Sequence, residues 1–202
     1  MILKVCGLKD KNNINQLNKI DIDFFGFIFY NKSSRFINQH LNISNITKQK
    51  VGVFVNESLE NIKKKIKDYN LNYVQLHGDE TPKFCKILMN FCKVIKAFRI
   101  YENFDIDNTN RYANCCDLFL FDTFSKNFGG SGKKFDWNKI RNFKNKKFLL
   151  SGGIDVESVN QINALKNENE FLFGIDINSK FEISPGLKDI NKINTFLKKL
   201  NK

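Results

Sequence analysis

The stretch VGVFVNESLENIKKKIKDYNLNYVQL, residues 51–76, contains the pattern that decides the fold. It begins and ends with short apolar runs rich in Val, Phe and Tyr, which are typical of strands buried on both faces. Between the runs, Leu59, Ile62 and Ile66 recur at helical spacing and leave Lys and Asn on the opposite side. This order of strand, helix and strand predicts a right-handed crossover between parallel strands.

The same unit recurs along the whole chain. Apolar runs start at intervals of roughly 20 to 30 residues, at 2–6, 24–30, 51–55, 73–76, 94–98, 118–121, 148–150 and 171–177. Ile190, Ile193 and Leu197 form another helical stripe, and Thr81 followed by Pro82 is a helix start signal. Segment 36–50 is weakly periodic, and we expect a short or irregular second helix there.

Eight such units predict an α/β fold, a (β/α)8 TIM barrel of eight parallel strands with short loops. The alternative is an open doubly wound sheet. The chain has no Gly-x-Gly-x-x-Gly after its first strand, which favours the barrel. No linker or change in composition interrupts the pattern, so we expect residues 1–202 to form a single domain.

Composition narrows the class of protein. A chain of 202 residues with 42% hydrophobic residues suits one globular domain. Its apolar runs are much shorter than the roughly 20 residues of a membrane helix, and its start lacks a signal-peptide pattern, so we expect a cytoplasmic protein. Neither the five Cys nor the two His have metal-ligand spacing, and we expect no metal.

The formal net charge of +12 first suggests a nucleic-acid binder. Lys is scattered through nearly every segment, however, and its densest clusters at 63–65 and 198–199 fall where solvated helix faces are expected. We therefore expect neither nucleic acid nor membrane as a partner. A basic surface would still attract a small anionic substrate.

The active site of such a barrel lies at the carboxyl ends of its strands. Asp122 closes an apolar run, and a carboxyl group in a desolvating mouth can serve as a proton donor. Cys6 closes the first run, and a thiol in basic surroundings ionises more easily and can accept a proton. The alternatives are a helix cap or Lys ion pair for Asp122, and a small buried hydrophobe for Cys6.

Other strand ends offer groups that can bind a substrate. Gly152 and Gly153 let main-chain N–H groups approach a phosphate, although the pair could be only a tight turn. Arg35 could fork onto a carboxylate or lie on the surface, and for His77 we favour a local hydrogen bond over a substrate contact. The remaining candidates are Gln75, Asp176, Asn178, Ser179 and Gly132, the last in a loop that could be a lid or a third wall of the phosphate site.

Several of these segments together resemble one enzyme family, phosphoribosylanthranilate isomerase. They occur in family order and are KVCGL (4–8), GFIFY (26–30), SSR (33–35), VGVFVN (51–56), VQLHGDE (74–80), FD (121–122), GGSGK (129–133), FDW (135–137), LSGGI (150–154), IDINS (175–179) and PGLKD (185–189). The resemblance implies an Amadori rearrangement of a phosphoribosyl aminoaldose in tryptophan biosynthesis. Asp122 would be the general acid, Cys6 the general base, and Arg35 the ligand of the anthranilate carboxylate.

The resemblance also implies a small phosphorylated substrate, no cofactor, and a monomer or homodimer. The phosphate would rest on main-chain groups around Gly132, Gly152, Gly153, Asn178 and Ser179. Two sister enzymes remain alternatives. Indole-glycerol-phosphate synthase would need Lys at strand ends, and the histidine-pathway isomerase would need Asp where this chain has Cys6.

Overall fold

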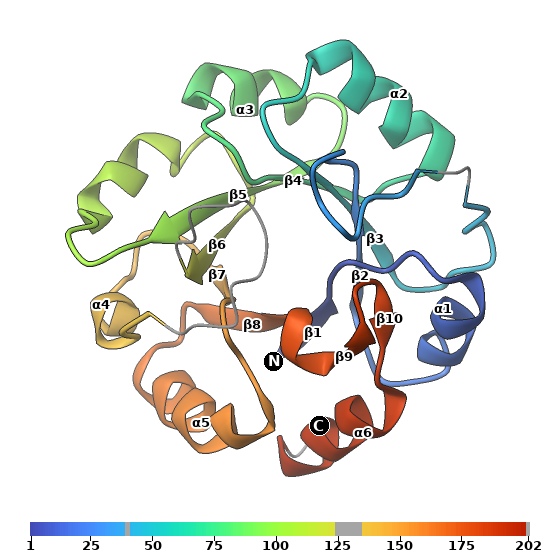
Figure 1. Ribbon diagram of the computed structural model, residues 1–202. Coiled ribbons are helices and arrows are strands. Elements are labelled where there is room, and N and C mark those ends of the chain that lie inside the picture. Colours follow the sequence, from blue (N-terminus) through green and yellow to red (C-terminus); the bar gives the residue numbers. More distant parts are fainter. Residues whose placement is uncertain (39–40, 124–134, 201–202) are drawn as a thin grey trace.

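A computed structural model describes residues 1–38, 41–123 and 135–200. Eight parallel strands pair in sequence order, and β8 pairs with β1, so the barrel is closed and the open-sheet alternative is excluded. Figure 1 shows the strands as a ring with the helices outside it. The strands are β1 Ile2–Val5, β2 Phe24–Ile28, β3 Gln49–Phe54, β4 Tyr73–Leu76, β5 Lys93–Ile100, β6 Leu118–Thr123, β7 Phe148–Leu150 and β8 Leu172–Ile177.

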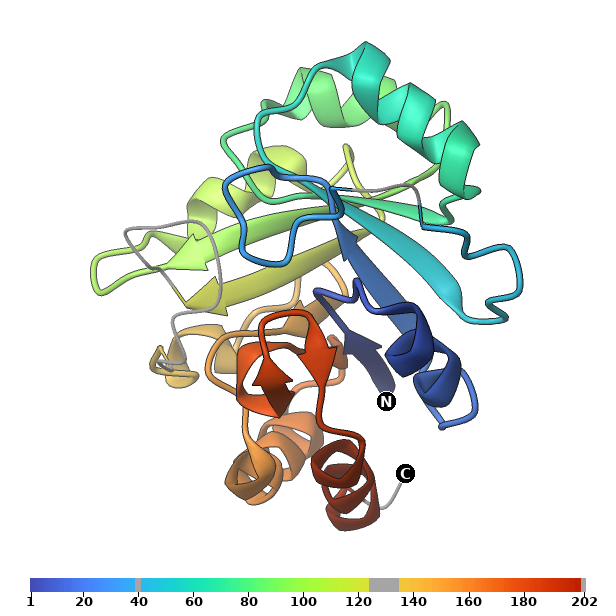
Figure 2. The ribbon, with the colours of Figure 1, turned by 45° about the vertical axis from the view of Figure 1, so that its right-hand side comes forward.

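The helices cover the outer face of the barrel in both ribbon views (Figures 1 and 2). Their starts follow the expected cap chemistry, since Ser58 and Thr81 each accept a hydrogen bond from the main chain three residues on. The α-helices are α1 Lys11–Leu17, α2 Leu59–Tyr69, α3 Pro82–Leu88, α4 Asn138–Arg141, α5 Val159–Glu168 and α6 Ile190–Lys199. Short 3-10 helices are η1 Ile106–Tyr112, η2 Val156–Ser158 and η3 Ser179–Phe181.

The connection from β2 to β3 is irregular. The short or irregular helix expected there is absent from its described parts, 29–38 and 41–48. Ile37, Ile43 and Ile46 are nevertheless buried and join the outer core. Isolated apolar contacts thus replace the continuous stripe that a helix would need. Within the described ranges, no helix is long and apolar enough to cross a membrane.

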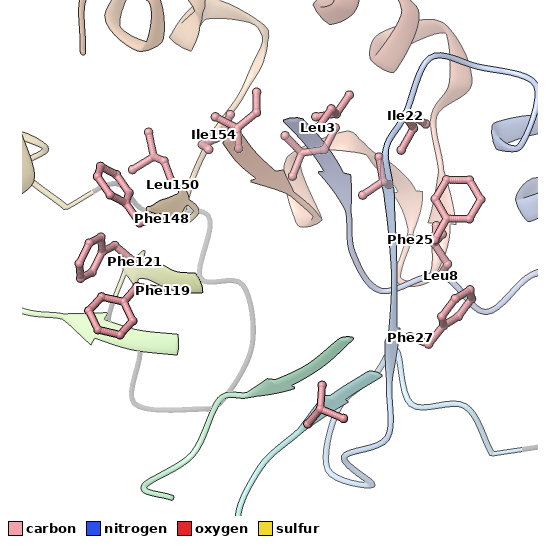
Figure 3. Close-up of a cluster of buried hydrophobic side chains, with 14 of the residues drawn as sticks. Leu3, Leu8, Ile22, Phe25, Phe27, Phe119, Phe121, Phe148, Leu150 and Ile154 are labelled. Atoms are coloured by element: carbon pink, nitrogen blue, oxygen red, sulfur yellow. The ribbon is translucent and has the colours of Figure 1, made fainter. Parts of the chain in front are cut away.

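Alternate residues of each strand face the helices and form the larger core. Figure 3 shows Phe119, Phe121 and Phe148 side by side on β6 and β7, and Leu3 and Phe25 on β1 and β2, away from them. The rings of Phe121 and Phe148 have centroids 5.2 Å apart at an interplanar angle of 60°. Such edge-on aromatic pairs add stability beyond their burial, so this layer fixes the carboxyl ends of β6 and β7.

The inward-facing residues divide the barrel into a filled base and a polar mouth. Phe24, Val51, Tyr73, Ile95 and Leu118 are buried together in the base. Cys6, Ile28 and Val53 form a separate small cluster above them. Because the base is packed, only the carboxyl end of the barrel can hold a ligand. A two-stranded hairpin, β9 Glu182–Ser184 and β10 Leu187–Lys188, follows β8 and lies over β1 in Figure 1.

Candidate active site

The mouth of the barrel contains a cavity of about 690 Å³, counting the space open to solvent. Its walls come from the carboxyl ends of β1, β2, β3, β4, β6, β7 and β8. They include most of the residues predicted for the site: Cys6, Gln75, His77, Asp122, Gly152, Gly153, Asp176, Asn178 and Ser179. Gly132 lies outside the described residues. Tyr30, Ser33 and Lys180 also line the cavity, and the sequence reasoning did not select them.

Cys6 follows β1 and is almost fully buried, with 4% of its surface exposed. Its main-chain N–H donates to the carbonyl of Ile177, which ties it to β8. Gly26 of β2 makes room for the side chain, because a Cβ atom there would lie 2.7 Å from Sγ of Cys6. The thiol therefore has a defined position at the floor of the cavity.

The expectation that Cys6 ionises easily is not met by its surroundings. Burial raises the pKa of the thiol above its ordinary value, and this effect outweighs the attraction of Lys4 and Lys188. Asp176 adds to the rise by repelling the thiolate. The sequence shows abundant Lys near Cys6, but it does not show how deeply the thiol is buried. Burial decides the direction in which the pKa of Cys6 shifts.

Asp122 belongs to a chain of three side chains across β4 and β6. Nε2 of His77 lies 3.2 Å from Oδ2 of Asp122, and Nδ1 of His77 lies 2.8 Å from Nε2 of Gln75. The imidazole ring of His77 is therefore held between the amide group of Gln75 and the carboxylate of Asp122. The predicted local hydrogen-bonding role of His77 thus has named partners. Among the described residues, Asp122 caps no helix and forms no ion pair with a Lys.

Gly152 and Gly153 end β7 in conformations that favour glycine, with φ of +87° and +65°. A Cβ atom on Gly152 would also lie 2.3 Å from Oγ1 of Thr123 and 2.9 Å from Oδ1 of Asp122. The β7 loop therefore packs directly against the end of β6. This contact places the Gly-Gly main chain and the Asp122 carboxylate in the same wall of the cavity.

Arg35 forks onto a carboxylate, as its chemistry predicted, but the carboxylate belongs to the protein. Its Nε and Nη2 atoms lie 2.9 Å and 2.6 Å from Oε1 and Oε2 of Glu182, on the hairpin after β8. Its side chain is 11% exposed, so the alternative of a surface Arg is wrong. Arg35 is not among the residues that line the cavity.

Glu182 also binds Lys188, whose Nζ donates to Oε1 of Glu182 and to Oδ1 of Asn178, both at 2.7 Å. Burial lowers the pKa of Lys188 to about 8, although Glu182 opposes this shift. For Glu182, hydrogen bonds from Arg35 and Lys188 overcome the effect of burial and lower the pKa. This network orients Asn178 at the edge of the cavity.

A buried ion pair lies beneath the cavity floor. Nζ of Lys4 donates to both carboxylate oxygens of Asp176 at 3.0 Å, and the two side chains are 0% and 5% exposed. Sequence reasoning selected Asp176 but missed Lys4 and Lys188, because Lys is rarely buried. Strand alternation could have found Lys4, which lies two residues before Cys6 and so shares its inward face. Over the described ranges, no group of three or more His, Cys, Asp or Glu side chains could hold a metal ion.

The comparisons with known proteins decide the family. The family model described as N-(5'phosphoribosyl)anthranilate (PRA) isomerase matches residues 3–199. This chain belongs to that family. It is therefore an isomerase, and its barrel is that of the phosphoribosylanthranilate isomerases of tryptophan biosynthesis.

Individual members of the phosphoribosylanthranilate isomerase family agree over the full chain. The N-(5'-phosphoribosyl)anthranilate isomerase of Parabacteroides distasonis is 41% identical, with 99% of this chain and 93% of the relative covered. The crystal structure from Thermotoga maritima is 32% identical with a TM-score of 0.84, covering 100% of this chain and 99% of that one. Another family structure, in complex with reduced 1-(o-carboxyphenylamino)-1-deoxyribulose 5-phosphate, is 30% identical with a TM-score of 0.80 at the same coverage.

Proposed function

We propose that Cys6 and Asp122 are the proton-transfer pair with which this isomerase converts N-(5-phosphoribosyl)anthranilate to its aminoketose. The observation that carries the proposal is that both side chains line one cavity, from strands β1 and β6. An aldose-to-ketose rearrangement needs one group that gives a proton to the ring oxygen and one that takes a proton from C2. A sugar bound between these two strands presents both atoms.

Asp122 would act first. Its carboxyl group gives a proton to the furanose ring oxygen, and the C1–O bond breaks while the lone pair of the anthranilate nitrogen forms a protonated imine with C1. His77 holds one carboxylate oxygen from 3.2 Å, and the N–H of Thr123 holds the other from 2.8 Å. These contacts fix the direction of the carboxyl group relative to the substrate.

Cys6 would act second, as a thiolate. It removes the proton from C2 of the sugar, and the C–H electron pair forms a C1–C2 double bond while the imine nitrogen becomes an amine. The enolamine then tautomerises, so that C2 becomes the ketone and C1 gains a proton. The imine forms within the substrate itself, so these steps involve only the two side chains and the substrate.

The ends of the substrate would lie on opposite parts of the mouth. We expect the phosphate to bind the main chain at Gly152, Gly153 and Ser179, where exposed Lys180 adds positive charge. Arg35 is our candidate ligand of the anthranilate carboxylate. That carboxylate would either compete with Glu182 for the guanidinium group or bind its remaining N–H groups. The enzyme would work in the cytoplasm as a monomer or homodimer, as one domain spanning 1–202.

The direct test is a fluorescence assay with purified protein and freshly made N-(5-phosphoribosyl)anthranilate. We expect the anthranilate-type fluorescence to disappear in proportion to enzyme concentration. Parallel assays with the histidine-pathway aminoaldose and with the indole-glycerol-phosphate synthase substrate would identify a sister activity. Turnover of one of those substrates alone would contradict the proposed function.

A further inference from the structure

We propose that Lys4 is a positioning residue for the Cys6 thiolate, held against it by Asp176. The inference rests on the proposed role of Cys6 as the base, because a buried thiolate needs a counter-ion. Lys4 and Cys6 point into the barrel from one face of β1, two residues apart, with Lys4 buried below the thiol.

The position of Lys4 is fixed from the other side by β8. Lys4 and Asp176 are register partners of the β1–β8 ladder, and Nζ lies 3.0 Å from each carboxylate oxygen. A two-oxygen contact leaves the ammonium group little freedom to turn away. The positive charge of Lys4 opposes the rise that burial causes in the pKa of the Cys6 thiol. The ammonium group is therefore held by the carboxylate of Asp176 and acts on the thiol through its charge.

The other charged groups that face Cys6 come from two elements. Asp176 of β8 repels a thiolate, whereas Lys188 of β10 attracts it more weakly than Lys4 does. On the β2 side, the neighbour is Gly26, which carries no charge. Lys4 is thus the strongest attraction that a thiolate meets in a site whose burial disfavours charge.

The barrel contains a second buried ion pair that serves as a matched control. Nζ of Lys96 lies 3.1 Å from Oε2 of Glu80, and both side chains are 3% exposed. Neither Lys96 nor Glu80 lines the cavity, and both charges act on Cys85 of α3, whose pKa burial raises to about 12. If Lys4 served only to fill and stabilise the barrel, replacing Lys4 or Lys96 should have the same effect on the titration of Cys6.

The test measures ionisation of Cys6 without substrate. The ultraviolet absorbance of the thiolate is titrated against pH, and each protein is compared with the same protein carrying Cys6→Ser. Asp176→Asn removes the repulsion and leaves Lys4, so Cys6 should ionise at lower pH. Adding Lys4→Met should reverse this shift and leave at least about tenfold less thiolate at a given pH, a typical effect of one close charge.

The control double variant, Lys96→Met with Glu80→Gln, should leave the Cys6 titration unchanged. Equal Cys6 titrations in Asp176→Asn with and without Lys4→Met would overturn the proposal, as would a shift of the same size in the control. Circular dichroism checks folding of each variant. If the Lys4→Met combination does not fold, Asp176→Asn alone decides, and ionisation at unchanged or higher pH contradicts the role of Lys4.

The titration also separates this inference from the proposed function. If Cys6→Ser keeps full isomerase activity, Cys6 is not the base, whatever its titration shows. If Cys6→Ser is inactive but the Cys6 titration does not change when Lys4 is replaced, the result supports the proposed function and contradicts the positioning role of Lys4.

Discussion

His77 and Asp122 face each other across the mouth of the barrel, with Nε2 of the imidazole 3.2 Å from Oδ2 of the carboxylate. The amide group of Gln75 holds Nδ1 of the same imidazole at 2.8 Å. Gln75 of β4 and His77, which directly follows β4, therefore determine how the carboxyl group of β6 is aimed. This arrangement fixes the direction of the carboxyl group that we propose as the proton donor before any substrate binds.

Replacement of Asp122 by Asn keeps the shape of the side chain and removes the proton. We expect kcat to fall by about 10²- to 10⁴-fold, the usual contribution of a general acid. Binding of the reduced product analogue, measured by calorimetry, should change little. A near-normal kcat for Asp122→Asn would remove Asp122 from the mechanism.

Arg35→Ala should chiefly raise KM, because the variant loses the proposed contact with the anthranilate carboxylate. Hydrogen bonds between charged groups contribute roughly 1.5–3 kcal/mol, so KM should rise by about ten- to a hundredfold. Steady-state kinetics gives the split between KM and kcat. Arg35→Lys is the matched control, since it keeps the charge but not the fork. An unchanged KM in Arg35→Ala would mean that the carboxylate binds elsewhere and that Arg35 serves Glu182.

Gly26→Ala tests whether turnover depends on the position of the Cys6 thiol. The new methyl group would lie 2.7 Å from Sγ of Cys6, so Cys6 must move, and overpacking of this kind costs about 1–3 kcal/mol. Gly174→Ala is crowded to a similar degree, 2.4 Å from the carbonyl oxygen of Ile2, but at the opposite end of β1. We expect both variants to lose stability in urea unfolding and only Gly26→Ala to lose kcat beyond its loss of folded protein. Equal kcat per folded molecule would contradict a defined position for Cys6.

Phe143→Ala tests the aromatic layer behind β6 and β7. The Phe143 ring lies 5.0 Å from that of Phe121 and 5.7 Å from that of Phe148, and the side chain is 6% exposed. Its loss should lower the free energy of unfolding by about 3–5 kcal/mol. Phe91→Ala is the control, because Phe91 is 45% exposed and its removal should cost less than about 0.5 kcal/mol. Similar unfolding curves for the two variants would show that this layer does not stabilise the barrel.

The strands and their order were predictable because each buried strand leaves a short apolar run in the sequence. Helix starts at Ser58 and Thr81 also follow local cap chemistry. The places of Cys6 and Asp122 in the cavity were predictable because each residue ends an apolar run. The carboxyl ends of the strands form the site of a barrel, so this prediction needs only the fold.

The buried charges could not be predicted in the same way. Lys4, Lys188 and Glu182 look like surface residues in the sequence. Lys188 and Glu182 are only six positions apart, but Lys4 pairs with Asp176, 172 positions away. The fork between Arg35 and Glu182 joins residues 147 positions apart. Only closure of the barrel, which brings β8 and its hairpin onto β1 and β2, creates these contacts. Contacts between residues distant in the sequence therefore decide the electrostatics of the site. The short apolar runs decide only where in the fold the site lies.

The most direct test of the central claim, that Cys6 and Asp122 share the proton transfers, is turnover of N-(5-phosphoribosyl)anthranilate by Cys6→Ser. Cys92→Ser serves as the control, because Cys92 lies between α3 and β5, away from the cavity. We expect Cys6→Ser to lose about 10²- to 10⁴-fold in kcat, since a hydroxyl group ionises far less readily than a thiol, and Cys92→Ser to match the unaltered protein. Equal turnover by Cys6→Ser and Cys92→Ser would contradict the account.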